Sequence, residues 1–507
     1  MANPLYDTLL GVHQGSDASF LHLQDGTTWS YDDFLRKVAQ FAHAITAEGV
    51  VAGDRIAAQI EKSPEALALY GACVQAGVVF LPLNTGYTVD ELSYFIENSG
   101  AKLVLCDAAN LDELTPVAAK YGARIATLNS DGSGTLSDAA GAMSDQFDTV
   151  ERRADDLAAF LYTSGTTGRS KGAMLTQNNL LSNAQTLAEY WQFTSDDVLL
   201  HALPIFHTHG LFVATNVVLA SGGAMIFLPK FNLDVMIDRL PQATTLMGVP
   251  TFYTRLLGDE RFTRDLTKHM RLFVSGSAPL LAETHVAFEA RTGHRILERY
   301  GMTETNMNTS NPYDGERRAG TVGFPLPGIE LKITDPATGE TLPQGEIGQI
   351  EVRGPNVFKG YWQMPEKTAE ELRADGFFIT GDLGQIDADG YVQIVGRDKD
   401  LIISGGYNIY PKEIELILDD QPGVLESAVI GVPHPDFGET VLGLIVPQKG
   451  ATPDLDAIAA QASTSLARFK HPRKLLLIDE LPRNTMGKVQ KNVLRQTYAD
   501  MFQVTSA

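Results

Sequence analysis

Short apolar runs alternate with helix-like segments along most of this 507-residue chain. The runs include LVLCD (103–107), AAFLYTSG (158–165), AMIFLP (224–229) and RLFVSG (271–276), and NNLLSNAQTLAEYW (178–191) is a helical stretch between two of them. Strands that are separated by helices of this length pair side by side through crossover connections. The pattern therefore predicts an α/β fold with a mainly parallel body.

The texture of the chain changes after about Gly323 to short strands and turns, and Asp389-Gly390 between two β runs is a strong hairpin signal. This part predicts a small β-barrel-like unit that closes the large domain. Beyond it, a helix that begins at Pro411 and further strands and helices predict a small α+β unit. We therefore expect a large N-terminal domain of parallel α/β subdomains over residues 1–397, and a small mobile C-terminal domain over 398–507.

Charge and cysteine content exclude several classes of protein. Lys and Arg number 40 and Asp and Glu 62, so the net charge of −22 argues against a nucleic-acid partner, which needs a basic face. Cys73 and Cys106 both lie in apolar runs and predict buried, inert thiols.

The most apolar stretch, 65–83, is interrupted by Gln75 and predicts a buried helix rather than a membrane span. No basic residue precedes Arg36, so no targeting signal is expected and the predicted location is cytoplasmic.

The segment YTSGTTGRSKG (162–172) combines glycines, hydroxyl side chains and a lysine directly after an apolar run. Glycines let backbone N–H groups turn toward an anion, and hydroxyls add donors, so the segment predicts a phosphate-binding loop. It is not a Walker A loop, because Ser170 and Gly172 flank Lys171 where that motif needs Gly before the lysine and Ser or Thr after it. The candidate phosphate ligands are Thr163, Ser164, Gly165, Thr166, Thr167, Gly168 and Lys171.

With eight further motifs, this loop resembles the adenylate-forming superfamily, which includes acyl-CoA synthetases, peptide-synthetase adenylation domains and firefly-type luciferases. In chain order the motifs are LPLN (81–84), LPIFHTHG (203–210), VSGSAPL (274–280), YGMTET (300–305), ITGDLG (379–384), VGRDKDLI (395–402), NIYPKEIE (408–415) and PRNTMGKVQK (482–491). The resemblance implies that a carboxylate attacks the α-phosphate of ATP, releases pyrophosphate and forms an acyl-adenylate.

The resemblance also assigns residues to ATP. It makes Glu304 the Mg²⁺ ligand, and a hard cation of this kind prefers oxygen ligands. It places the Thr303 hydroxyl on the α-phosphate, Asp382 on the ribose hydroxyls with Arg397 in support, and adenine against Tyr300. The other residues that it assigns to ATP are Ser277, Glu298 and Arg299.

The C-terminal motifs carry the moving parts of such an enzyme. By resemblance, Lys488 bridges the carboxylate and the α-phosphate, Lys399 is the hinge of the small domain, and Gly405 and Gly406 line the approach of the coenzyme A thiol. Enzymes that acylate or deacylate Lys488 are further candidate partners. Lys491, close to Lys488, is interpreted as an ordinary surface lysine.

The identity of the acid is indicated by polar residues where an apolar pocket is expected. Arg255 offers a bidentate fork for a second carboxylate, and His209 follows the gate-like His207, which also has a catalytic role by resemblance. The pattern closely resembles malonyl-CoA synthetases and implies malonate, with methylmalonate left open. The sequence also leaves open whether Arg255 or His209 holds the second carboxylate, and whether the acid is another short-chain carboxylic acid. The residues assigned to the acid are Arg255, His207, His209, Ser277 and Met302.

Three rival functions are less well supported. A peptide-synthetase adenylation domain would need an acidic residue for the substrate ammonium in the 203–210 region, which has none. A luciferase-type oxygenase shares the ATP motifs and differs in its product, and a non-catalytic protein has no use for the full set of ATP residues. We expect an AMP-forming acid–thiol ligase that uses ATP, Mg²⁺ and coenzyme A, without a membrane partner. The sequence does not indicate its oligomeric state.

Overall fold

The computed structural model describes residues 2–163, 170–404, 407–435, 437–484 and 487–502. By their internal contacts these residues form two compact units. Unit 1 comprises Met1–Glu330 and Val352–Phe378, and unit 2 comprises Leu331–Glu351 and Ile379–Ala507. The predicted division after residue 397 falls inside unit 2, and it stays a prediction about which part of the chain moves.

Unit 1 contains a nine-stranded sheet in the order β15-β14-β13-β12-β11-β9-β10-β1-β2. The run from β13 to β1 is parallel, and antiparallel strands complete both edges. The strands are β1 (Ser19–His22), β2 (Thr28–Ser30), β9 (Val198–His201), β10 (Ala224–Phe227), β11 (Thr245–Gly248), β12 (Leu272–Ser275), β13 (Leu297–Met302), β14 (Asn306–Ser310) and β15 (Phe324–Pro325). The inner strands are buried along their length, as strands covered on both faces should be.

A second sheet of unit 1 has the order β6-β5-β3-β4-β7-β8 and is parallel except for the β7–β8 pair. Its strands are β3 (Arg55–Gln59), β4 (Val79–Pro82), β5 (Leu103–Cys106), β6 (Arg124–Thr127), β7 (Leu157–Thr163) and β8 (Lys171–Thr176). The antiparallel β7–β8 pair brings Thr163 opposite Lys171, so the two ends of the candidate phosphate loop meet in one ladder. The predicted mainly parallel α/β body is confirmed.

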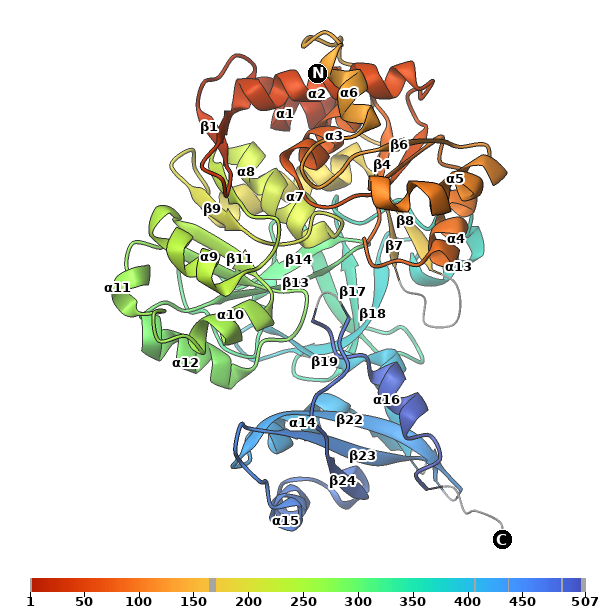
Figure 1. Cartoon of the computed structure of the whole chain (residues 1–507). Helices are drawn as coiled ribbons and strands as arrows, with labels where there is room; N and C mark the ends of the chain where they lie inside the picture. The colour runs from red at the N-terminus through yellow and green to blue at the C-terminus, as the bar shows by residue number, and fades with distance from the viewer. Residues whose placement is uncertain (1, 164–169, 405–406, 436, 485–486, 503–507) are drawn as a thin grey trace. The chain divides into compact units, whose positions relative to one another are not determined.

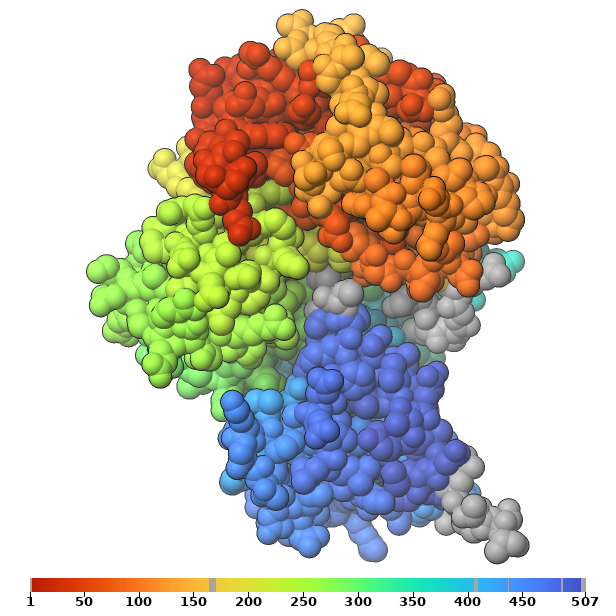
Figure 2. Space-filling model, in the orientation of Figure 1, coloured from red at the N-terminus to blue at the C-terminus, as the bar shows by residue number. Residues whose placement is uncertain are grey.

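The helices of unit 1 begin at residues suited to capping. Ser30 and Thr176 form capping boxes at the starts of α2 (Tyr31–Ala47) and α7 (Gln177–Tyr190), each satisfying backbone N–H groups that a helix start leaves unpaired. The other helices are α1 (Pro4–Leu9), α3 (Pro64–Gln75), α4 (Val89–Ser99), α5 (Leu111–Lys120), α6 (Thr135–Gly141), α8 (Asn216–Ser221), α9 (Leu233–Arg239), α10 (Pro250–Leu257), α11 (Arg264–Thr267), α12 (Ala282–Thr292) and α13 (Pro365–Glu371). The labelled helices α1 to α13 lie around the strands of unit 1 in Figure 1, and Figure 2 shows one packed surface from the red and orange segments to the green ones.

Unit 2 is built on two smaller sheets. One has the order β16-β17-β18-β19, and its β18–β19 hairpin turns at Asp389-Gly390 as predicted, with Gly390 at φ 91°. The other has the order β21-β20-β23-β22, with β24 added beside β23. The strands are β16 (Glu330–Thr334), β17 (Gly348–Arg353), β18 (Phe378–Ile386), β19 (Val392–Arg397), β20 (Ile402–Ser404), β21 (Tyr407–Ile409), β22 (Val424–His434), β23 (Gly438–Pro447) and β24 (Lys474–Leu477), and the helices are α14 (Pro411–Asp419), α15 (Leu455–Ser465) and α16 (Lys491–Thr497). The predicted small α+β region at the C-terminus is confirmed.

Two expectations from composition can be compared with the structure. Cys73 and Cys106 are both free and fully buried, and burial raises the pKa of the Cys106 thiol to about 11, so both are inert thiols as predicted. Among the described helices, none combines the length and apolar composition that a bilayer crossing requires.

Candidate functional site

The parallel strands of the nine-stranded sheet bring the sequence motifs of unit 1 to one edge. Strands β9, β11, β12 and β13 run side by side in the same direction, so the segments that follow their carboxyl ends lie at the same edge of the sheet. Those segments contain residues 203–210, 249–255, 276–280 and 303–305. The crevice at this edge is the usual position of a ligand in an open α/β sheet.

The segment after β9 enters an unusual helix. Residues His209–Thr215 form a π-helix, a conformation that is rare and concentrated at functional sites. Its first turn is packed so tightly that a Cβ at Gly210 would overlap the carbonyl group of Pro204. His209 is thereby buried, and its Nδ1 lies 3.1 Å from the hydroxyl oxygen of Ser277.

Ser277 has a backbone conformation that indicates a constrained site. Its φ of 69° places it in the left-handed region, which costs energy for a residue other than glycine and which clusters at ligand sites. The hydrogen bond to His209 connects this strained turn to the π-helix. The predicted acid residues His209 and Ser277 are therefore brought together.

Arg299 lies in the same region, on β13, and is buried at 4% exposure. Its guanidinium fills the space beside Gly276, where any Cβ would overlap it. Within the described residues, its Nε and Nη2 have no hydrogen-bond partner. Burial lowers the pKa of Arg299 from 12.5 to about 9, because a charged guanidinium without a counter-ion is poorly stabilised there.

His209 shares this lack of a partner. Its Nε2 is buried with no hydrogen-bond partner in the described part of the chain. Burial, and then the charge of Arg299, keep the pKa of His209 well below 6.5, so the ring is neutral at physiological pH. Buried polar atoms are normally hydrogen-bonded, so Nε and Nη2 of Arg299 and Nε2 of His209, which have no partner in the described residues, mark a candidate ligand site.

Arg255 is the residue that the sequence predicts to face the acid. It lies exposed on α10, with its guanidinium carbon 5.6 Å from the centre of the Phe231 ring. The buried arginine of this region is Arg299, which the sequence assigned to ATP. Met302 is the last residue of β13 and Thr303 follows it, and both are partly buried. His207 lies one turn before Leu211, and the carbonyl of His207 accepts a hydrogen bond from the Leu211 N–H.

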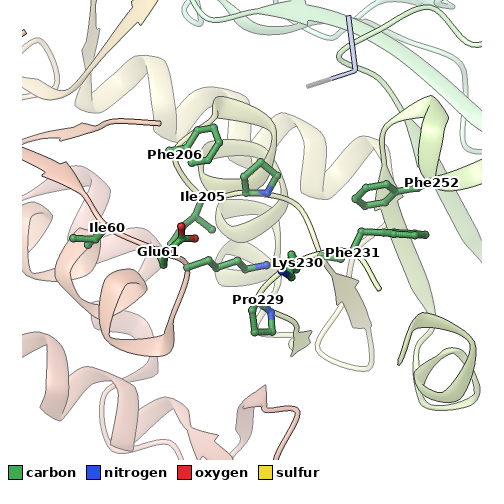
Figure 3. Close-up of a pocket in the computed structure, with 11 residues that line it drawn as sticks. Ile60, Glu61, Ile205, Phe206, Pro229, Lys230, Phe231 and Phe252 are labelled. Atoms are coloured by element: carbon green, nitrogen blue, oxygen red, sulfur yellow. The ribbon is translucent and has the colours of Figure 1, made fainter. Parts of the chain in front are cut away.

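A pocket of about 230 Å³ lies beside the 203–210 segment, as Figure 3 shows. Its walls come from the segments after β3, β9 and β10 and from α10, and they are mainly apolar, including Ile205 and Phe206. Lys62 is buried in this wall, where its ammonium lies 2.9 Å from Nδ1 of His201 and 2.8 Å from the His201 carbonyl oxygen.

The candidate ATP residues of unit 1 include a carboxylate suited to a hard cation. Glu304 is 4% exposed, and its Oε1 accepts a hydrogen bond of 3.0 Å from the Tyr361 hydroxyl. No group of three or more His, Cys, Asp or Glu side chains in the described residues is arranged for a metal. Mg²⁺ keeps most of its waters and binds one or two carboxylates beside substrate phosphates, and Glu304 offers one buried carboxylate.

The two described ends of the phosphate loop differ in their surroundings. The hydroxyl oxygen of Thr163 is buried without a hydrogen-bond partner in the described residues, which suits a phosphate ligand. Lys171 has its ammonium 3.1 Å from both carboxylate oxygens of Glu371. Ser164, Gly165, Thr166, Thr167 and Gly168 lie outside the described residues, as do Gly405 and Gly406.

Two other predicted ATP residues of unit 1 are buried or partly buried on β13. Tyr300, the residue expected to stack on adenine, is half-buried. The carboxylate of Glu298 is directed to His285, with Oε1 3.5 Å from Nδ1, and burial raises the pKa of this carboxyl. The backbone carbonyl of Glu298 accepts hydrogen bonds from Asn311. The main chain of Glu298, rather than its side chain, therefore holds this segment in place.

In unit 2, Asp382 and Arg397 face each other across the β18–β19 ladder, with Arg397 Nε 2.8 Å from Asp382 Oδ1. The carboxylate of Asp382 is almost fully buried, so the pairing fixes its orientation. Lys399 follows in the short 3₁₀ helix Asp398–Asp400, where burial and then the charge of Arg397 lower its pKa. Asp400 pairs with Arg495 of α16 at 3.0 Å, which ties this predicted hinge segment to the C-terminal helix.

Lys488 is exposed and lies on a turn that is stabilised by hydrogen bonding. The side chain of Asn484 accepts from the Lys488 N–H at 2.9 Å, and Gly487 takes a left-handed φ of 75°. The interpretation of Lys491 as a surface lysine is wrong. Its ammonium lies 2.5 Å from the buried carboxylate of Glu415 on α14, and this ion pair anchors the segment that carries Lys488.

Two residues that the sequence reading missed are Tyr361 and Glu371, which contact Glu304 and Lys171. They lie in FKGYWQMPEKTAEE (358–371), a segment without a recognisable phosphate or metal motif. Only the fold brings them to the end of the phosphate loop.

Comparison with known families gives two matches along the chain. The family described as AMP-binding enzyme matches residues 11–362, and the AMP-binding enzyme C-terminal domain matches residues 413–488. Among curated relatives, a malonate–CoA ligase of Arabidopsis thaliana is 37% identical over 482 residues, covering 89% of this chain and 79% of the relative. A feruloyl-CoA synthase of an Amycolatopsis species is 36% identical, covering 93% and 94%.

Among solved structures, the ATP-bound crystal structure of MatB from Rhodopseudomonas palustris has 58% sequence identity and a TM-score of 0.97. The match covers 99% of this chain and 100% of that one. Relatives with different acids share similar identity with this chain, so overall identity alone does not choose the acid.

Proposed function

Because this chain belongs to the family of AMP-binding enzymes, we propose that it ligates malonate to coenzyme A through an acyl-adenylate. The observation that carries the choice of acid is the group of buried nitrogen atoms on Arg299 and His209 that have no partner among the described residues. A dicarboxylic acid supplies a second carboxylate, which offers the guanidinium a counter-charge and hydrogen-bond acceptors. A fatty or aromatic acid would leave the guanidinium buried without a counter-charge, which is strongly unfavourable.

Arg299, with His209 and Ser277, is the proposed anchor of the second carboxylate. A guanidinium offers two parallel N–H groups to a carboxylate, and such charge-assisted pairs are strong in a dry site. Arg255 is the weaker candidate because its exposed guanidinium gains less from a charge pair in water. Methylmalonate, which keeps both carboxylates and adds one methyl group, remains an alternative acid.

In the first half-reaction, an oxygen of the other carboxylate forms a bond to the α-phosphorus of ATP. The bond from that phosphorus to the bridging oxygen breaks, and pyrophosphate leaves. Lys171 and Thr163 bind the phosphates that leave, and Thr303 and Lys488 stabilise the charge on the α-phosphoryl oxygens. Mg²⁺ held by Glu304 would neutralise phosphate charge, and Asp382 with Arg397 and Tyr300 hold the nucleoside.

In the second half-reaction, the thiol of coenzyme A releases its proton to solvent and its sulfur bonds to the acyl carbon. The bond from that carbon to the phosphate oxygen breaks, and AMP leaves. His207, Gly405 and Gly406 are the proposed residues at the thiol approach. Lys399 is the proposed hinge of the small domain. Rotation about it would withdraw Lys488 after adenylation and bring the thiol-approach residues into its place. Lys399→Pro should retain pyrophosphate release and lose thioester formation, whereas Lys399→Ala should retain both; full thioester formation by the proline variant would remove the hinge role.

Location and modification stay proposals as well. Lys488 is exposed, so an acylating or deacylating enzyme could reach it. We retain the cytoplasm as the proposed location.

Arginine substitutions test the acid assignment. For each variant, kcat/KM is measured with malonate and with propionate, which lacks the second carboxylate. Arg299→Met should lower the malonate value about 100-fold and change the propionate value less than about fivefold, because a charged hydrogen-bonded pair contributes about 1.5–3 kcal/mol. Arg255→Ala is the matched control and should change the ratio little. A malonate preference that survives Arg299→Met and is lost in Arg255→Ala would transfer the anchor to Arg255.

A further inference from the structure

A cluster of charged groups lies at the end of the phosphate loop and centres on one tyrosine. The Tyr361 cluster consists of Lys171, Glu304, Tyr361, Lys367 and Glu371. All five belong to unit 1, and they come from β8, from the segment after β13, and from the segment that ends in α13. None of the predicted roles of the phosphate loop accounts for Tyr361, Lys367 or Glu371.

Tyr361 connects two carboxylates. Its hydroxyl oxygen lies 2.6 Å from Oε2 of Glu371 and 3.0 Å from Oε1 of Glu304. A phenol has a single hydrogen, which the two carboxylates share, and the shorter contact to Glu371 is the stronger of the two hydrogen bonds. Through this hydroxyl, the position of the candidate Mg²⁺ ligand Glu304 depends on the position of Glu371.

Glu371 also holds the lysine of the phosphate loop. The Lys171 ammonium is equidistant from both Glu371 oxygens and lies 4.1 Å from the centre of the Tyr361 ring. Lys367 pairs with the same carboxylate at 3.0 Å. Lys171 is only 16% exposed and Glu371 22%, so the pair is screened less by water than a surface ion pair.

We propose that Glu371 and Tyr361 are positioning residues for ATP: Glu371 holds the Lys171 ammonium ready for the triphosphate, and Tyr361 aligns Glu304 with it. This inference rests on the proposed function for the identity of the nucleotide. The charge of Glu371 also has an opposite effect, on the affinity for ATP. A carboxylate next to the phosphate grip repels the triphosphate, so the cluster gives up some nucleotide affinity for a fixed geometry.

Glu371→Gln separates these two effects, because the amide keeps the size of the side chain and removes its charge. Binding of ATP without Mg²⁺, measured by calorimetry, should become about threefold or more tighter, since the repulsion is gone. The kcat for pyrophosphate release should fall about tenfold or more, because Lys171 is no longer held. Glu370→Gln is the matched control: Glu370 neighbours Glu371, is 65% exposed and pairs with Lys367, and its variant should change neither quantity more than twofold.

Tyr361→Phe tests the second link and keeps the ring under Lys171. Its Mg²⁺-free ATP affinity should stay within about twofold of the wild type, and the gain in ATP affinity on adding Mg²⁺ should shrink about fivefold. The proposal is overturned if Glu371→Gln weakens ATP binding and kcat together, if it matches Glu370→Gln, or if Tyr361→Phe leaves the Mg²⁺ effect intact. A wild type that binds ATP but uses a different acid would overturn the proposed function alone, and one that does not bind ATP would overturn both.

Discussion

The guanidinium of Arg299 occupies the space beside the α-carbon of Gly276, so a side chain at position 276 and the observed arginine conformation exclude each other. The atoms that an added Cβ at position 276 would overlap belong to the far end of the flexible Arg299 side chain. The Gly276→Ala variant should therefore fold normally and displace the guanidinium of Arg299. We predict that this variant raises the KM for malonate about tenfold and leaves the KM for propionate within about twofold. Steady-state pyrophosphate release with both acids measures this, and equal changes for the two acids would contradict the prediction.

The lowered pKa of Arg299 predicts a dependence of acid selectivity on pH. Burial favours the neutral form, so in the enzyme without substrate the guanidinium loses its proton as the pH rises through about 9, and full charge is present below that value. The ratio of kcat/KM for malonate to that for propionate should therefore be constant below about pH 8 and fall above pH 9. The titration of groups that serve both acids, such as Lys488, changes both kcat/KM values equally and therefore cancels in the ratio. A ratio independent of pH up to 10 would argue against a charged Arg299 as the anchor.

Lys488 is expected to serve only the first half-reaction. Lys488→Ala should lower malonate-dependent pyrophosphate release about 1,000-fold or more, because a positioned cation at a developing phosphoryl charge is a large contributor to rate. Conversion of supplied malonyl-adenylate to malonyl-CoA should remain within about fivefold. Lys449, an exposed lysine two residues after β23 ends, provides the control variant Lys449→Ala, which should retain both activities. Equal loss in both half-reactions would refute the assignment.

The Lys491–Glu415 pair predicts a stability effect that a surface lysine would not have. Lys491→Met leaves the buried Glu415 carboxylate without its closest cation, and breaking a buried pair in this way costs about 3–5 kcal/mol. We expect about 3 kcal/mol in chemical denaturation, since Lys491 is partly exposed. The double variant Glu415→Gln/Lys491→Met removes both charges and should recover at least half of the loss. A single variant within about 0.5 kcal/mol of the wild type would contradict a buried pair.

The fold of this chain and the chemistry of its candidate site differ in how far the sequence reveals them. Strands such as β5 and β12 are continuous apolar runs between helical segments, so local pattern is enough to find them and to predict a parallel sheet. The role of Arg299 is not visible in this way. Its neighbour in the sequence, Tyr300, suggests nucleotide binding, and only the packing of Gly276 and His209 shows that the guanidinium is buried without a partner.

Long-range charge pairing explains the other differences. Glu371 lies 200 positions from Lys171, and Glu415 lies 76 positions from Lys491, so no local pattern links either pair. Arg255 illustrates the opposite case: its residue type in a pocket-forming segment predicts an anion ligand, but its place on the exposed side of α10 comes from the helix register. Pairings of this kind are properties of the tertiary structure.

Activation of a small dicarboxylic acid for transfer to coenzyme A can be measured as pyrophosphate release and acyl-CoA formation. These are followed for a panel of mono- and dicarboxylic acids of two to six carbons, with and without coenzyme A. We predict the highest kcat/KM for malonate, malonyl-CoA and AMP as products, and at least about 100-fold lower values for propionate and butyrate. A monocarboxylic acid that matches or exceeds malonate would contradict this prediction.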